Sequence, residues 1–505
     1  MFFLLSLLTF FDFKAMLYSI ALNLFFVKRK RRIYMMNLVV ECMLSLRPAF
    51  SRRATFTWFV VAFVGIVLRA DTLGVTSIVR ALSLPPGCYT SLLHFFHSTA
   101  YNVSGLMARW LEWLMSRNVA FFVNGRAVLI GDHTKTPKDS RRMPAVATLH
   151  QDSETASKPS FFKGHHWGCM ALLVTAGKKR FAVPLEASIQ EGTKSIDGSD
   201  TPKTIRTVEM ARRFVQRTGH AAYLVLDAYF AGGPVFIAAA CAINGVANQV
   251  HILTRAKSNV VAYMPAPPTK AGTLGRKPVY GEKLKLAELF DSRPDQFQSV
   301  QSRVYDTVET TRFLVLDLLW KPVKGKLRFI LVETSRGRII LMSSDLLLEP
   351  LVAIQLYCHR VAIETLFDTF KNTIGGMCYH FWSGYLQPIS RRPVKNQKII
   401  QTSSQPDKTI NTLAAIEKFV ALHLLVVGML QMLAVLCTEE IKTHSRCWLR
   451  TVSNDIPSEF VTRSALANVI KNNSCGFLSE MISLVIHQQE NPPYINRKKS
   501  QDMLK

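Results

Sequence analysis

Four polar residues recur at helical spacing around position 360: Tyr357, Arg360, Glu364 and Lys371. The last three follow Tyr357 at offsets of 3, 7 and 14 residues. At about 100° per residue, these offsets place all four within a stripe about 60° wide on one helix face. The remaining face is apolar and comprises Leu356, Ile363, Leu366, Phe367 and Phe370. We therefore expect a helix that packs on a sheet and displays a carboxylate between two cations and a phenol.

These side chains suit phosphodiester chemistry. A carboxylate binds a divalent cation, Arg and Lys hold phosphate oxygens, and a tyrosine hydroxyl can donate to the same backbone. The alternative interpretation is a solvated helix face with an ion pair between residues four apart.

Two further carboxylates follow short apolar runs that read as buried strands. The run at 126–131 ends at Asp132, and the run at 222–226 ends at Asp227. Parallel strands end at one edge of a sheet, so Asp132, Asp227 and Glu364 are expected to converge there. Three carboxylates from separate elements are what two Mg²⁺ ions need to activate water and stabilise a leaving 3′ oxygen.

The elements around these acids predict an α/β domain. Residues 170–175 and 180–185, joined by a Gly-Lys-Lys turn, predict a hairpin. A helix is expected from Thr201, as cap, and Pro202 to about Arg217, another after 231–234, and a strand at 249–253. Four strand-like segments then follow without helices, at 300–308, 312–320, 327–333 and 338–342. They predict an all-β insertion, after which a long helix is expected over 345–372.

The rest of the chain divides by composition. Residues 37–119 show helical periodicity, which predicts a compact module that either binds DNA or is a plain helical bundle. Residues 388–411 form a basic linker, and the tail beyond 440 is expected to fray. The predicted units are an apolar extension that is possibly not native (1–35), a helical DNA-binding module (36–120), the first part of the α/β domain (121–256), the β insertion (257–344), the second part (345–440) and a C-terminal tail (441–505).

Composition limits the classes of partner. The 505 residues include 62 Lys and Arg against 35 Asp and Glu, a formal charge of +27. Such a field attracts polyanions, so nucleic acid or an anionic membrane surface is the first partner to consider.

The 9 cysteines form no CxxC pair, which favours a reducing compartment, here the cytoplasm and its nucleoid. No GxxxxGK[ST] or HExxH motif is present, so no nucleotide cofactor is expected.

Two apolar stretches raise the membrane alternative. Residues 1–27 are interrupted by Asp12 and Lys14 and precede a cationic block, and an upstream-translated segment before Met35 or Met36 is the favoured reading. The stretch 419–437 is 19 residues long, which permits a membrane span. A helix buried on all sides of a large domain fits the same pattern and is the preferred interpretation.

The spacing Tyr357-(2)-Arg360-(3)-Glu364-(6)-Lys371 resembles the Tyr-Arg-Glu-Lys signature of DDE transposases from bacterial insertion sequences. Asp132 and Asp227 look like the first and second acids of that family, and Gly164-His165-His166-Trp167-Gly168 also resembles a family segment. The resemblance implies an RNase H-like mixed sheet flanked by helices and interrupted by a β insertion.

The same resemblance implies a function. Metal-dependent hydrolysis at the element ends would be followed by strand transfer into target DNA, with two Mg²⁺ ions, or Mn²⁺ in their place. Asp132, Asp227 and Glu364 would be the catalytic and metal-binding acids, while Tyr357, Arg360 and Lys371 would hold DNA phosphates. The implied partners are transposon-end DNA, target DNA and a second copy of the chain.

The roles of two sets of side chains remain open, and so do two rival classes of protein. Trp320 could stack on a flipped base or be a strand aromatic at a sheet surface. His133, His165 and His166 could touch metal or DNA, or serve in packing. The rival classes are a catalytically silent, transposase-derived DNA-binding protein and a membrane-associated protein.

Overall fold

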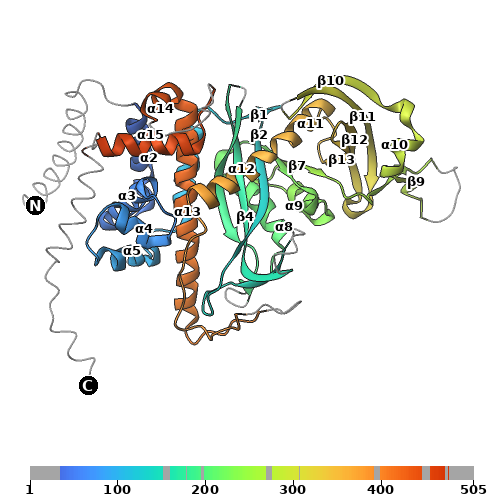
Figure 1. Ribbon diagram of the computed structural model, residues 1–505. Helices are drawn as coiled ribbons and strands as arrows, with labels where there is room; N and C mark the ends of the chain where they lie inside the picture. Colours follow the sequence, from blue (N-terminus) through green and yellow to red (C-terminus); the bar gives the residue numbers. More distant parts are fainter. Residues whose placement is uncertain are drawn as a thin grey trace, which may run out of the picture.

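The computed structural model describes residues 34–151, 160–177, 179–194, 198, 200–268, 276–305, 307–391, 399–445, 455–472 and 476. The apolar segment 1–27, residues 392–398 of the basic linker and the end of the C-terminal tail lie outside these residues. Figure 1 shows a helical part around the long helix α13 (Pro406–Leu436), a central sheet, and a β-rich part on the far side.

One mixed sheet of 13 strands runs through the centre and the β-rich part. Its main order is β3-β4-β2-β6-β7-β13-β12-β11-β8-β9, with β5 on β4, β1 on β2 and β10 on β11. The strands are β1 (Phe122–Val123), β2 (Arg126–Pro137), β3 (Ala147–His150), β4 (Phe161–Ala176), β5 (Lys179–Ile189), β6 (Ala222–Leu226), β7 (Val250–Arg255), β8 (Val261–Pro265), β9 (Tyr280–Lys285), β10 (Gln298–Val304), β11 (Thr307–Trp320), β12 (Gly325–Thr334) and β13 (Gly337–Ser343). The mixed α/β fold and the expected β4–β5 hairpin are confirmed.

Strand β2 is longer than its apolar run predicts, because it has different partners along its length. Residues 127–130 pair in parallel with β6, while residues 129–137 pair antiparallel with β4. Asp132 therefore does not end the strand as expected. It stands just beyond the parallel part, where β6 has ended and β4 still supplies hydrogen bonds.

The β insertion continues the central sheet. Strand β13 pairs antiparallel with β7, and β12, β11, β8 and β9 follow in order. The four expected strands correspond to β10–β13, and β8 and β9 are additional. The expectation of no helix here is wrong, because the short helix α10 (Leu289–Ser292) lies between β9 and β10.

Helices cover the two faces of the central sheet. Helix α8 (Lys203–Thr218) packs on β2, β4 and β6, and α9 (Gly233–Ala240) packs on α8 and β7. The expected Thr201 cap is wrong, because the cap residue is Pro202 and no side chain caps this end.

The expected single helix over 345–372 is three segments. Helix α11 (Pro350–His359) is capped by the Glu349 carboxylate, α12 (Val361–Asp368) follows, and a π-helical turn, η6, spans Thr369–Thr373. At the junction Arg360 N donates to Tyr357 O and Ile363 N donates to Arg360 O, three-residue bonds that tighten the chain. Arg360 keeps right-handed helical angles, so the polar stripe continues across the break.

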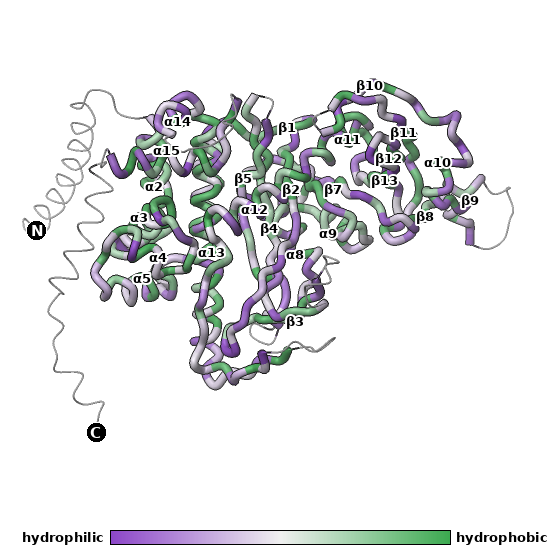
Figure 2. Tube along the Cα trace, in the orientation of Figure 1, coloured by the Kyte–Doolittle hydropathy of each residue, from purple (hydrophilic) through white to green (hydrophobic). Residues whose placement is uncertain are grey.

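The N-terminal helices pack with the C-terminal ones. These helices are α2 (Tyr34–Leu46), α3 (Arg53–Leu68), α4 (Gly74–Ala81), α5 (Cys88–His97), α6 (Val103–Met115), α14 (Thr438–His444) and α15 (Glu459–Asn472). They surround α13, and α15 is a packed element within the expected tail. In Figure 2, α3 and α13 are apolar over most of their length, as helices buried on several sides must be.

Helix α13 is the one described helix long and apolar enough to cross a membrane, and 89% of its most apolar window is buried within the protein. Its polar side chains find partners inside the fold. Lys418 Nζ donates to Ser98 O (2.6 Å), and Gln431 Nε2 donates to the Glu459 carboxylate (3.0 Å). These contacts are those of a core helix.

Candidate active site

The two aspartates lie side by side at the edge between β2 and β6. Ile130 pairs with Val225 in the parallel register, so Asp132 and Asp227, two residues further on, are neighbours on adjacent strands. Parallel strands lie about 4.8 Å apart, which brings the two carboxyls together. The sequence prediction that both acids meet at one sheet edge agrees with this geometry.

Strand alternation points Asp132 away from α8. A Cβ added to Gly131 would lie 2.8 Å from Thr207 of α8, and the His133 ring bonds the Thr207 hydroxyl at 3.0 Å. Residues 131 and 133 therefore face α8, and Asp132 between them faces α11 and α12.

Local hydrogen bonds orient both carboxyls. Asp132 Oδ1 accepts from the His133 backbone N–H (2.7 Å). Asp227 caps the short 3₁₀ helix η2 (Ala228–Phe230), and its Oδ1 accepts from Tyr229 N–H (3.0 Å). The Thr254 hydroxyl on β7 also donates to the Asp227 carbonyl (2.6 Å), which fixes the strand end beneath the carboxyl.

Arg360 connects the strand acid to the helix acid. Its Nη1 lies 3.3 Å from Asp132 Oδ2, and its Nη2 lies 2.5 Å from Glu364 Oε1. Side-chain exposure is 16% for Asp132 and 52% for Glu364, so the site opens to solvent at Glu364. The helix stripe is thus not a detached solvated face, because one of its cations reaches across to the sheet.

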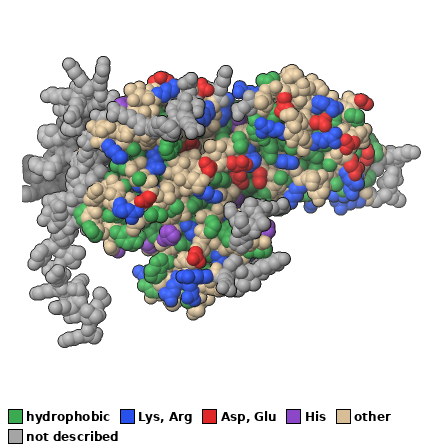
Figure 3. All heavy atoms as spheres, in the orientation of Figure 1, with side chains coloured by type: hydrophobic (Ala, Val, Ile, Leu, Met, Phe, Trp, Pro, Cys, Tyr) green, Lys and Arg blue, Asp and Glu red, His purple; other side chains and the backbone are tan. Residues whose placement is uncertain are grey.

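Figure 3 shows acidic side chains gathered near the middle of this face, where Figure 1 places α12. Glu364 and Asp368 are the exposed acids of that helix. Lys and Arg side chains are spread over the β-rich part beside them.

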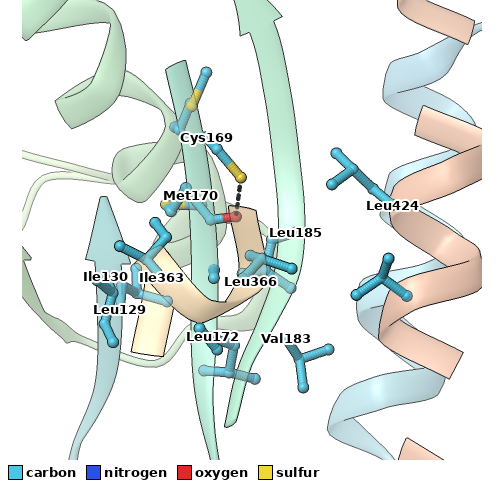
Figure 4. Packing of buried hydrophobic residues seen from close by; sticks show 14 of the residues in the cluster. Leu129, Ile130, Cys169, Met170, Leu172, Val183, Leu185, Ile363, Leu366 and Leu424 are labelled. Carbon is cyan, nitrogen blue, oxygen red and sulfur yellow. Dashed lines mark hydrogen bonds between the residues drawn. The ribbon is translucent and has the colours of Figure 1, made fainter. Parts of the chain in front are cut away.

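Hydrophobic packing holds α12 against the sheet. Ile363 and Leu366 are buried and lie beside Leu129 and Ile130 of β2 and Leu172 of β4 in the close-up of Figure 4. The apolar face predicted for this helix is thereby confirmed for Leu356, Ile363, Leu366 and Phe370, all of which are buried.

Burial and like charge act together on the aspartates. Burial, and next the charge of Asp227, raises the pKa of Asp132 to about 7. Burial also raises the pKa of Asp227, with Glu364 adding to the rise. For Arg360 burial opposes the charge, but the hydrogen bond to Glu364 and the charges of Asp132 and Glu364 raise its pKa above the usual value.

The other two stripe residues lie at either side of this group. Tyr357 is half-buried, burial raises its pKa, and the Arg360 guanidinium carbon lies 6.0 Å from its ring centroid. Lys371, in the π-helical turn, donates from Nζ to the carbonyl of Lys135 on β2 (3.2 Å), and burial lowers its pKa. Arg360 therefore contacts Asp132 directly, while Tyr357 lies beside Arg360 and Lys371 reaches β2 at Lys135.

The donor set fits a divalent cation in part. Two adjacent aspartyl carboxyls with raised pKa values are a hard oxygen pair whose mutual repulsion such a cation would relieve. Among the described residues, no three His, Cys, Asp or Glu side chains are grouped closely enough to share one ion. Arg360 stands between Asp132 and Glu364, so Glu364 would join the aspartates only if the guanidinium moved.

The three histidines form hydrogen bonds with groups of the protein itself. His165 is fully buried between the Tyr379 hydroxyl (2.7 Å) and the Pro144 carbonyl (2.8 Å), and burial lowers its pKa to about 3. His166 bonds the Glu191 carboxylate at 3.1 Å, and burial lowers the pKa of His133 to about 3.

Of the two interpretations of Trp320, base stacking and a strand aromatic, the structure favours a packed strand aromatic. Its side chain is 8% exposed, and its ring packs edge-on against Phe236 of α9 at a centroid distance of 5.6 Å. A ring held in that contact cannot receive a base, so its role is to dock the insertion on α9.

Sequence reasoning missed Tyr229, which lies two residues after the second acid. Its side chain is 49% exposed, Lys203 lies 5.4 Å from its ring centroid, and its ring contacts that of His133. An aromatic residue two positions after a strand-end acid is the signal that could have identified it.

A mixed sheet with two adjacent aspartates at the edge between β2 and β6 and a flanking helical glutamate defines an RNase H-like DDE domain. Comparison with protein families agrees: residues 45–313 match the family described as DDE superfamily endonuclease. The chain belongs to this family of endonucleases. The matched range contains Asp132 and Asp227 and ends before Glu364. A comparison with curated proteins gave no match.

Proposed function

We propose that this endonuclease is the DNA transposase of an insertion sequence, which cuts the ends of its element and joins them to target DNA. The observation that carries the proposal is the contact of Arg360 with both Asp132 and Glu364 beside Asp227. It combines the acids that strand cleavage needs with a cation that suits a phosphate.

The reaction starts with hydrolysis at the element end. Water attacks the phosphorus, the bond from phosphorus to the 3′ oxygen breaks, and that oxygen takes a proton to leave as a 3′-OH. The 3′-OH then attacks a phosphorus in target DNA, and a second 3′ oxygen leaves with a proton. Bound divalent cations of the kind this family generally uses would supply charge for the attacking and leaving oxygens.

The proposed site residues have two roles, since some bind the divalent cations and others bind DNA. Asp132, Asp227 and Glu364 are the proposed cation-binding acids. Arg360, released from the carboxylates when a cation replaces it, is placed to bind a DNA phosphate. Tyr357 and Lys371 approach the same position from either side and are proposed to bind neighbouring phosphates.

The proposal extends to partners and location. The protein acts on element ends and target DNA as a homodimer in the nucleoid. The helical module of residues 36–120 is proposed to contribute to DNA binding, and the predicted domain boundaries stay predictions.

The test starts from the DNA around the reading frame. Inverted terminal repeats and a short target duplication should flank it, and a duplex carrying one repeat with its flank should be cut by the purified protein with Mg²⁺. The products should include a 3′-OH end that joins to a second DNA. Tight binding of the repeat with no cleavage under any divalent cation would instead identify a silent, transposase-derived DNA-binding protein.

A further inference from the structure

A second hollow lies on the other side of the helix that carries the stripe. This cleft has a volume of about 480 Å³ and is bordered by the β4–β5 hairpin, the end of β10, α11–α12, α13 and α15. Figure 1 shows α11 beside the β-rich part and α12 across the central sheet on the side of α13. None of Asp132, Asp227, Arg360 and Glu364 lines the cleft.

The helix turns that hold the site also form one wall of the cleft. The wall is formed by Gln355, Cys358, His359, Val361, Ala362 and Thr365. These residues occupy a different stripe of the helix from Tyr357, Arg360 and Glu364. One pair of short helices thus separates the cleft from the acids.

The cleft is cationic. Lys179 and Arg180 at the start of β5 and Arg303 near the end of β10 all line it. Within the part of the chain that the structure describes, no carboxylate lies within 4.0 Å of these three cations. Glu459 is the acid in the lining, and its Oε1 accepts from Gln431 Nε2 at 3.0 Å.

Polar atoms in the lining lack partners within the protein. Arg180 Nη1 donates to the carbonyls of Gly177 (3.1 Å) and Lys179 (3.3 Å), but its Nε is buried without a hydrogen-bond partner. The guanidinium carbon is held 4.7 Å from the Phe121 ring centroid. A buried donor in a cationic cleft is costly unless a ligand oxygen satisfies it.

An aromatic side chain completes the lining. Tyr305 lines the cleft at the β10–β11 turn, with the Arg336 guanidinium carbon 4.2 Å from its ring centroid. Cations placed beside a phenol are the groups that follow a nucleic-acid strand, where phosphates alternate with sugar and base.

We propose that this cleft binds the phosphate backbone of a DNA strand that passes behind α11–α12 while the acids act on the DNA in front. The inference rests on the proposed function, since it assigns a second contact to the same DNA. Lys179 and Arg303, on separate hairpins, contact phosphates, and Arg180 supplies the buried donor. A strand bound there touches the same helix turns that carry Arg360 and Glu364.

The test measures how DNA binding depends on salt. Each cation that neutralises a phosphate adds about 0.9 to the slope of log affinity against log salt, so Lys179→Gln and Arg303→Gln should each lower the slope by about one on a duplex of about 30 base pairs. The double variant should lower it by about two. Lys283→Gln on the edge strand β9, an exposed lysine outside the cleft, is the matched control and should leave the slope unchanged.

An unchanged slope in the double variant, with its thermal midpoint unchanged, would overturn the inference. A small-anion site is the other outcome that would do so: about 10 mM inorganic phosphate would then raise the thermal midpoint of the wild type but not of the double variant, with no change in DNA slope. Failure of the proposed function looks different, because DNA would not be cut by the wild type although the cleft variants still lowered the slope.

Discussion

The environment of Asp132 predicts that the free energy of unfolding falls as the pH rises. Replacing Asp132 by asparagine, which carries no titrating group, should remove this loss. In the folded protein the pKa of Asp132 is raised to about 7, mainly by burial and then by Asp227. An unfolded chain has an Asp pKa of about 3.9. The folded state therefore keeps a proton over a range where the unfolded state has lost it.

The sign and size follow from linkage. The stabilisation from this proton is complete below about pH 4 and is lost as the pH rises through about 7. One pH unit corresponds to about 1.4 kcal/mol, so about 3 kcal/mol should be lost between pH 5 and pH 8. Asp132→Asn carries no titrating group there and should lose correspondingly less.

The assay is urea unfolding of wild type and Asp132→Asn with a chelator present. The variant should gain about 3 kcal/mol of unfolding free energy over the wild type between pH 5 and pH 8. Asp139→Asn, which removes an exposed carboxylate outside the site, is the control for general charge effects. A constant difference between wild type and Asp132→Asn across this range would refute the assignment of a raised pKa to Asp132.

Three further predictions test other parts of the structure. Arg360→Ala should lower the salt slope of element-end binding by about one, because one phosphate contact is lost, and an unaltered slope would count against that role. Arg463 donates to the carbonyls of Ile66, Val67 and Thr373, so Arg463→Ala should cost at least about 2 kcal/mol in urea unfolding; a loss below about 0.5 kcal/mol would contradict this. Trp320→Ala should cost about 3 kcal/mol with DNA affinity unchanged when assayed where the variant is folded, and a selective loss of DNA binding would restore the stacking role.

Local sequence pattern predicted correctly those parts of the site that depend on residues close in sequence. The apolar run ending at Leu226 corresponds to β6 residue for residue. The helical spacing of Tyr357, Arg360 and Glu364 survives the break between α11 and α12, because Arg360 keeps helical backbone angles. Side-chain periodicity depends on those angles and not on an unbroken hydrogen-bond ladder.

Contacts between distant segments explain what the sequence did not predict. Strand β2 continues past Asp132 because residues 164–172 of β4 supply backbone hydrogen-bond partners. The sequence of β2 itself does not indicate this pairing. The insertion joins the central sheet through β13 and β7, a pairing of residues more than 80 positions apart. The sequence around Trp320 does not distinguish an exposed strand aromatic from a buried one. Its burial depends on the contact with α9.

The contact of Arg360 with Asp132 is likewise a long-range fact, and so is the cleft behind the helix. Both depend on how α12 lies across β2 and β5, which the stripe alone does not specify. The sequence predicted which residues share one face of the helix. The structure shows which residues of the sheet lie opposite that face.

The central claim is that Asp132, Asp227 and Glu364 form one DNA-cleaving centre. The most direct measurement is Mg²⁺-dependent strand cleavage by Glu364→Gln beside the wild type, with DNA binding measured on the same preparations. Cleavage by Glu364→Gln should fall by at least about a thousandfold while binding stays within about twofold, because binding rests on phosphate contacts and cleavage on the acids. Cleavage at the wild-type rate by Glu364→Gln would contradict this claim.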